Sequence, residues 1–170
     1  MVVGTEARDK ETGELIFKLV TNLFIRGIGG FGNKGSVKID VPSTPARAPD
    51  AEAEETTTPN QAFLYRLNGD YNPLHVDPDM SAVGGFKVPI LHGLCFYGIT
   101  AKAVFEKYHK EDPTLLKKIN ARFTGHVFPG ETLVVQMWKE GHKVIVQTKT
   151  KERGTVVLKG VCELKPEAKL

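Results

Sequence analysis

The chain has 170 residues, of which 41% are hydrophobic and 25% charged, ordinary values for one globular domain that exclude disorder and fibrous structure. Its 23 basic and 20 acidic residues are spread along the sequence and give a net charge of +3, which argues against a nucleic-acid-binding protein with a concentrated basic stripe. No apolar run approaches the length of a membrane span, and the two cysteines, without CxxC spacing or a signal sequence, are expected to be reduced thiols inside the cell.

The segment Val2 to Ile25 predicts a β-hairpin, because apolar and polar residues alternate on both sides of a turn at Asp9 to Gly13. A hairpin of the same kind closes the chain, with strands over Val144 to Thr150 and Val156 to Leu164 joined at Lys151 to Gly154. This repetition suggests two related units, the first represented only by its last piece, and therefore a truncated tandem.

A glycine-rich stretch follows the first hairpin, between Gly27 and Gly35. Three of its glycines satisfy the GxGxxG pattern of dinucleotide sites: Gly27, Gly29 and Gly32. Such a site needs a helix that begins at the glycines, whereas Val37, Ile39 and Val41 alternate as in a strand. We therefore expect a flexible turn here and no bound cofactor.

The remaining segments predict an α+β protein. Residues Pro42 to Pro59 contain almost no large apolar group and are expected to form a connecting loop, and Gln61 to Leu67 a short helix. From Gly93 to Tyr108 the apolar positions, beginning with Leu94, recur every three or four residues and predict a long helix with a buried face. Strands are expected at Lys118 to Val127, at Thr132 to Trp138 and in the closing hairpin, so that an antiparallel sheet can wrap around the helix.

The loop from Asn68 to Pro78 contains the first candidate catalytic residues. Its prolines and glycine exclude a continuous helix or a central strand and hold Asp70, Asn72 and His75 on a stiff loop. A carboxylate, an amide and an imidazole this close together can jointly hold one water molecule. Adding that water to an activated alkene requires a proton to be taken from it and another to be given to the neighbouring carbon, and histidine suits the first task.

Three other interpretations of this loop are open. Asp70 could serve an Asx turn, and His75 could be a structural histidine. Asp70, His75 and Asp77 could also bind a metal ion, although no second cluster with ligand spacing occurs in the sequence.

A second candidate site lies where the segment Val88 to Cys95 enters the long helix. Gly93 stands at the helix N-terminus, where unpaired N–H groups and the helix dipole favour negative charge and where a ligand can approach the backbone. Its N–H could polarise a thioester carbonyl and stabilise an enolate-like transition state. The alternative is that Gly93 only permits tight packing, and we expect His92 to be structural rather than catalytic.

Three segments together resemble the hydratase 2 (MaoC-like) family. The run from Tyr65 to Ser81 contains Gly-Asp-x-Asn-Pro-Leu-His, and the runs Pro89 to Cys95 and Ala121 to Phe123 also match. Together with Gly130 and Trp138 they extend the resemblance over almost the whole chain. It is most similar to the C-terminal, catalytic half of the hydratase 2 region of eukaryotic peroxisomal multifunctional enzymes of type 2. One departure is Asn68, where the family usually has a smaller residue.

The resemblance implies a hot-dog fold and a (3R)-specific enoyl-CoA hydratase of fatty acid β-oxidation, without metal or organic cofactor. Asp70 and His75 would be the catalytic pair, Asn72 would orient the water, and Gly93 would donate to the thioester oxygen. The residues implied to bind substrate are Gly69, Tyr71, Pro73, Leu74 and Phe123. Two alternatives are a hot-dog acyl-CoA thioesterase and a non-catalytic acyl-CoA-binding truncation product.

The expected organisation has three parts: residues 1–35, a hairpin resembling the end of a preceding hot-dog unit with the glycine-rich turn; residues 36–167, the catalytic domain; and residues 168–170. These last residues, Ala-Lys-Leu, nearly match the Ser-Lys-Leu signal and predict a peroxisomal protein that binds the import receptor. Eukaryotic relatives carry a complete non-catalytic unit ahead of the catalytic one, which helps to bind CoA. A lone unit leaves a sheet edge and an apolar face open, which predicts a homodimer that binds an acyl-CoA thioester.

Overall fold

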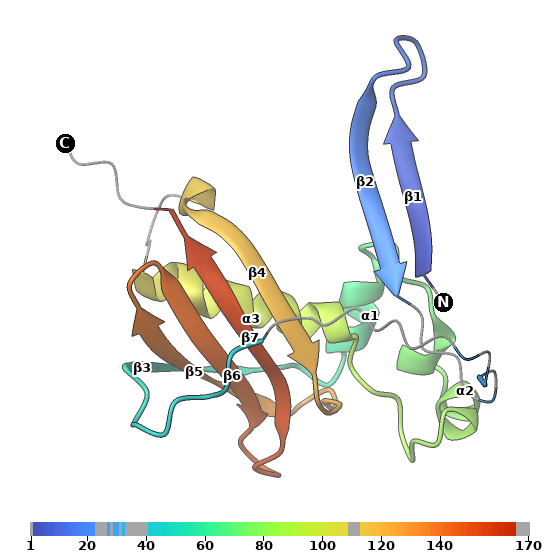
Figure 1. The fold of residues 1–170 in the computed structure, drawn as a ribbon. Coiled ribbons are helices and arrows are strands. Elements are labelled where there is room, and N and C mark those ends of the chain that lie inside the picture. The colour runs from blue at the N-terminus through green and yellow to red at the C-terminus, as the bar shows by residue number, and fades with distance from the viewer. Residues whose placement is uncertain are drawn as a thin grey trace. The chain divides into compact units, whose positions relative to one another are not determined.

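A computed structural model of the chain describes residues 2–22, 27, 29–30, 32, 41–108 and 113–165. The chain divides into two compact units, Met1–Lys38 and Ile39–Leu170 (Figure 1). The strand-like alternation expected at Val37 and Ile39 lies outside the described residues, and Val41 belongs to no strand.

The first unit contains the predicted hairpin. Strand β1 (Val2–Arg8) pairs antiparallel with β2 (Leu15–Asn22), and the expected continuation to Ile25 lies outside the described residues. In the turn, the Asp9 carboxylate accepts hydrogen bonds from the backbone N–H groups of Glu11 and Thr12 and from the Thr12 hydroxyl. These bonds lower the pKa of Asp9. The turn is thus fixed by a local side-chain cap.

The two faces of the hairpin differ in charge, and both carry apolar side chains. Strand alternation and the cross-strand register place five residues without charge on one face: Val3, Thr5, Ala7, Phe17 and Leu19. The other face carries Glu6, which forms ion pairs with Arg8 at 2.9 Å and with Lys18 at 3.2 Å. Phe17 on the uncharged face is 57% exposed.

The second unit is built on a five-stranded antiparallel sheet in the order β3-β5-β6-β7-β4. Its strands are β3 (Ala51–Thr56), β4 (Leu116–Phe123), β5 (Thr132–Glu140), β6 (Lys143–Thr150) and β7 (Val156–Leu164). The three predicted strand regions and the turn at Lys151–Gly154 are confirmed, with shifts of a few residues at their ends.

Strand β3 corrects the prediction that residues 42–59 form only a connecting loop. Ala51 and Ala53 alternate with glutamates, and the alanines pack against the core while the strand pairs with β5. Alanine is small and both it and glutamate are uncommon in strands, so the alternation carried little hydrophobic signal. The pairing with β5 and the packing of the alanines stabilise this edge strand.

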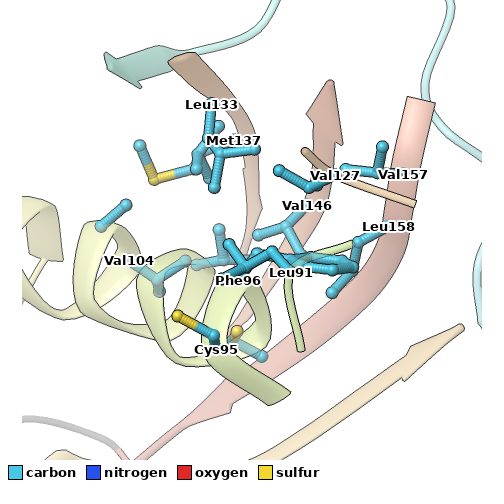
Figure 2. Packing of buried hydrophobic residues seen from close by; sticks show 14 of the residues in the cluster. Leu91, Cys95, Phe96, Val104, Val127, Leu133, Met137, Val146, Val157 and Leu158 are labelled. Atoms are coloured by element: carbon cyan, nitrogen blue, oxygen red, sulfur yellow. The ribbon is translucent and has the colours of Figure 1, made fainter. Parts of the chain in front are cut away.

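Helix α3 (Gly93–Tyr108) lies across one face of the sheet, as Figure 1 shows. Its buried residues include Cys95, Phe96 and Val104, which meet Leu133, Met137, Val146 and Leu158 of the sheet in the hydrophobic core (Figure 2). The predicted helix is confirmed, but Leu94 at the start of the expected buried stripe is 58% exposed. Because apolar residues surround almost the whole helix, periodicity alone does not identify the face that packs on the sheet.

Short helices between β3 and α3 complete the unit: α1 (Gln61–Arg66), the 3-10 turn η1 (Pro73–His75) and α2 (Pro78–Val83), and a second 3-10 turn, η2 (Pro113–Leu115), precedes β4. The predicted short helix is confirmed as α1, with its N-cap at Asn60. A long helix packed on an antiparallel sheet is the predicted α+β, hot-dog arrangement. Among the described residues, no helix is long and apolar enough to cross a membrane.

Candidate functional site

The loop that carries Asp70 is held by its own polar side chains. The Asp70 carboxylate accepts a hydrogen bond from the Asn72 backbone N–H at 3.2 Å, and the Asn72 side-chain oxygen accepts one from the Leu74 N–H at 3.1 Å, where it caps η1. Arg66 donates to the Tyr71 carbonyl at 2.8 Å. The Asx-turn interpretation of Asp70 is thus confirmed. Since a carboxylate accepts several hydrogen bonds, Asp70 can still bind a water molecule while it supports the turn.

His75 is held in one orientation below this loop. It is 9% exposed, and its Nδ1 lies 2.7 Å from the carbonyl oxygen of Ile90. A carbonyl oxygen only accepts, so Nδ1 must carry the proton, and in the neutral ring Nε2 keeps its lone pair. The structure therefore fixes the tautomer in which Nε2 can act as a base.

His92 forms the other side of the site. Its ring is stacked on His75, with centroids 3.8 Å apart and planes at 29°, and it also contacts the ring of Tyr65 at 4.8 Å. Its Nε2 lies 3.3 Å from the backbone carbonyl of Asp70. Burial and the nearby His75 lower the pKa of His92, which favours the neutral ring. One side chain thus contacts both members of the predicted catalytic pair.

Asp70, His75 and His92 form the one cluster of potential metal ligands among the described residues, with ligand atoms within 4.8 Å of one another. The metal hypothesis named Asp77 instead, but its carboxylate caps α2 by accepting from the N–H groups of Asp79 at 2.9 Å and Met80 at 3.4 Å. A metal ion bound to an imidazole nitrogen lies close to the ring plane, and two rings stacked face to face offer no common point near both nitrogens. The stacking therefore favours an acid–base site over a metal site.

Gly93 and Phe123 meet at the start of α3. Gly93 is the first residue of the helix, where backbone N–H groups lack partners within the helix. A Cβ atom at this position would lie 3.4 Å from Cε1 of Phe123, the last residue of β4. The ring of Phe123 is partly exposed and also contacts Phe96 edge to face. The structure thus brings together two predicted site residues that are thirty positions apart in the sequence.

The other predicted substrate-binding residues have different environments. Gly69, Tyr71 and Pro73 are exposed on the loop, and Gly69 has a φ angle of 101°, a conformation that favours glycine. Leu74 is half-buried and packs against the end of α2, since its Cδ1 would lie 2.8 Å from a Cβ atom on Gly84. Leu74 therefore supports the loop from below.

An apolar cavity of about 270 Å³ lies beside His75. Its walls come from several separate segments: Pro59, Ala62, Phe63, His75, Val76, Val88, Pro89, Phe128 and Pro129. Phe128 is fixed there by Arg153, which lies over its ring and forms an ion pair with Glu131. Sequence reasoning missed this cavity because no single motif contains its walls.

A family model described as MaoC like domain matches residues 40–161. The chain is 53% identical, over 92% of its length, to peroxisomal hydratase-dehydrogenase-epimerase of Neurospora crassa, of which it covers 18%. It is 47% identical, over 95% of its length, to enoyl-CoA hydratase 2, peroxisomal, of Arabidopsis thaliana, of which it covers 55%. The crystal structure of a MaoC-like dehydratase from Phytophthora capsici superposes with a TM-score of 0.86 at 40% identity, covering 98% of this chain and 59% of that one. The chain therefore spans about half, or less, of the length of these relatives.

Proposed function

The chain belongs to the MaoC-like domain family, and we propose on that basis that it is a hydro-lyase, a (3R)-specific enoyl-CoA hydratase. It would add water reversibly across the double bond of a trans-2-enoyl-CoA and give the (3R)-3-hydroxyacyl-CoA. The observation that carries this proposal is the tautomer of His75, whose Nδ1 is bonded to Ile90 and whose Nε2 is left as a base. A ring nitrogen of His75 also lies within 4.8 Å of a carboxylate oxygen of Asp70. The names of relatives, such as enoyl-CoA hydratase 2, supply the substrate class.

In the proposed reaction, the water lies between the Asp70 carboxylate and Nε2 of His75. The pair removes a proton from this water while its oxygen bonds to the β-carbon, and a proton is delivered to the α-carbon, so that one water is added overall. Asn72 uses its side-chain oxygen in the cap of η1, which leaves its amide nitrogen to donate to the water.

The thioester oxygen would accept a hydrogen bond from the N–H of Gly93. Negative charge develops on this oxygen as water adds to the β-carbon, and the start of α3 offers both an N–H donor and the positive end of the helix dipole. Phe123, which lies against Gly93, would line the acyl-CoA site, with Gly69, Tyr71, Pro73 and Leu74 contributing from the loop.

The organisation of the protein is part of the same proposal. Residues 1–35 would be a hairpin segment with a glycine-rich turn, residues 36–167 the catalytic domain and residues 168–170 a signal for the peroxisomal import receptor. The relatives named peroxisomal support this location. The exposed apolar side chains of the hairpin support a homodimer.

The first test follows the absorbance of trans-2-decenoyl-CoA with the purified chain and with the variants Asp70→Asn and His75→Gln, and determines the chirality of the product. We expect hydration to the 3R alcohol, lowered by at least about 100-fold in both variants, as expected for the loss of a general acid or base. His142→Gln, an exposed histidine in the β5–β6 turn, is the matched control and should keep full activity. Release of free CoA would instead identify a thioesterase, and binding without turnover a non-catalytic acyl-CoA binder.

A further inference from the structure

We propose that His92 is a positioning residue, which holds His75 by ring stacking and the Asp70 backbone by a hydrogen bond, so that the pair keeps the geometry needed for catalysis. This inference rests on the proposed function, because it assigns a role within the same site. His92 itself need not touch the reacting atoms.

The ring of His92 is held in a fixed position. His92 is 1% exposed, and its ring contacts the rings of both Tyr65 and His75. The backbone around His92 is fixed by two hydrogen bonds. The Leu91 N–H donates to the carbonyl oxygen of Val127 at 2.7 Å, and the Cys95 N–H donates to the backbone carbonyl oxygen of His92 at 3.1 Å. A rigid backbone and a stacked ring together restrict the movement of His75.

The ring of His92 carries a proton on only one of its two nitrogens. The Asp70 carbonyl only accepts, so Nε2 of His92 carries the proton, and the neutral ring leaves a lone pair on Nδ1. This Nδ1 is buried and has no hydrogen-bond partner among the residues that the structure describes. A second proton would therefore place an unpaired, charged N–H group in the interior beside His75, which is unfavourable. His92 is held neutral, so it places no positive charge beside His75.

The two contacts of His92 are made with different partners, Asp70 and His75. The hydrogen bond fixes the backbone from which the Asp70 carboxylate projects, whereas the stack fixes the plane in which Nδ1 of His75 meets Ile90. Two substitutions separate these contacts. His92→Phe keeps an aromatic ring but has no donor for Asp70, and His92→Gln keeps a donor but has no ring for His75.

The test measures kcat and KM for enoyl-CoA hydration with the wild-type chain, His92→Phe, His92→Gln and the control His142→Gln. We expect each His92 variant to lower kcat by about 10- to 100-fold, the usual effect of a small displacement of catalytic groups. KM should change by less than about threefold, because binding of the ground state is left intact. Thermal melting checks that each variant is folded. An unchanged kcat in both folded variants would overturn the proposal.

A second measurement reads the geometry without activity. Nitrogen-15 NMR of the imidazole rings should show His92 neutral and protonated on Nε2 at about pH 6.5, where an unshifted histidine is half protonated. At about pH 9, where an ordinary histidine ring is neutral, the spectra should show the His75 tautomer that is protonated on Nδ1 in the wild type and in His92→Phe, and a mixture of tautomers in His92→Gln. If the wild type does not hydrate enoyl-CoA, the proposed function fails, and these spectra decide on positioning alone. A His75 spectrum that is identical in His92→Gln and wild type would then overturn it.

Discussion

Among single residues, Cys162 makes a prediction for alkaline pH. Burial raises the pKa of its thiol from 9.0 to about 12. The folded state thus holds the thiol proton more tightly than the unfolded chain. This contribution to stability is complete below pH 9 and is lost as the pH rises towards 12, by up to about 1.4 kcal/mol per pH unit.

We expect the free energy of unfolding to fall between about pH 8 and about pH 10 more steeply in the wild type than in Cys162→Ala, as measured by urea denaturation. Burial also raises the pKa values of Tyr65, Cys95, Tyr97 and Tyr108, and these groups are present in both proteins. Because Cys162 itself contributes to the raised pKa of Tyr97, the difference in slope reports on Cys162 and on its effect on Tyr97. Equal slopes would contradict the prediction.

His92 shows why some residues of the site escape sequence analysis. The loop sequence predicted Asp70, Asn72 and His75 as candidate site residues, because the three polar groups lie within six positions of one another. The contact between His92 and His75 joins segments seventeen positions apart and depends on how the backbone enters α3. The one sequence signal for His92 was its position directly before Gly93, and from it His92 was expected to be structural rather than catalytic.

At the scale of secondary structure, Gly160 in β7 is expected to tolerate no side chain. A Cβ atom there would lie 2.7 Å from the backbone oxygen of Asn120 and 3.2 Å from side chains of Ala121 and Val146 on the neighbouring strands. Gly160→Ala should therefore destabilise the protein by about 1–3 kcal/mol, because the strands must move apart. Chemical denaturation measures the loss, and an unchanged unfolding midpoint would contradict it.

Gly98 in α3 predicts the opposite effect. It is exposed, and a Cβ atom there would meet no atom within 4 Å. Gly98→Ala should stabilise the protein by about 0.5–1 kcal/mol, since alanine loses less backbone entropy in a helix. The same denaturation experiment compares both glycines, and a loss of stability in Gly98→Ala would show that this face of the helix is covered in solution.

The elements also show the limits of hydrophobic patterns. The closing hairpin and α3 were predictable because strongly β-forming residues alternate in one and apolar residues recur at helical spacing in the other. Strand β3 was not, since Ala51 and Ala53 acquire their role only when β5 lies beside them. The exposure of Leu94 likewise depends on which face of α3 the sheet covers.

At the scale of the whole molecule, we predict that two copies of the chain associate through the uncharged face of the hairpin. Phe17 on the uncharged face and Ile16 on the opposite face are exposed to similar extents, 57% and 64%. If the uncharged face binds a second copy, Phe17→Lys should shift the protein from dimer to monomer, whereas Ile16→Lys should not, because a buried unpaired charge is costly. Light scattering measures the mass, and a stable wild-type monomer at micromolar concentration would contradict the homodimer.

The hydrogen bond between Nδ1 of His75 and the carbonyl oxygen of Ile90 also limits proton transfer through the imidazole ring. The far nitrogen of the imidazole already donates to a carbonyl oxygen, which cannot accept a proton for onward transfer. His75 is therefore no relay between the site and the interior. In the proposed reaction, a proton that Nε2 of His75 accepts must leave from the same nitrogen. It passes either to the substrate or to the solvent.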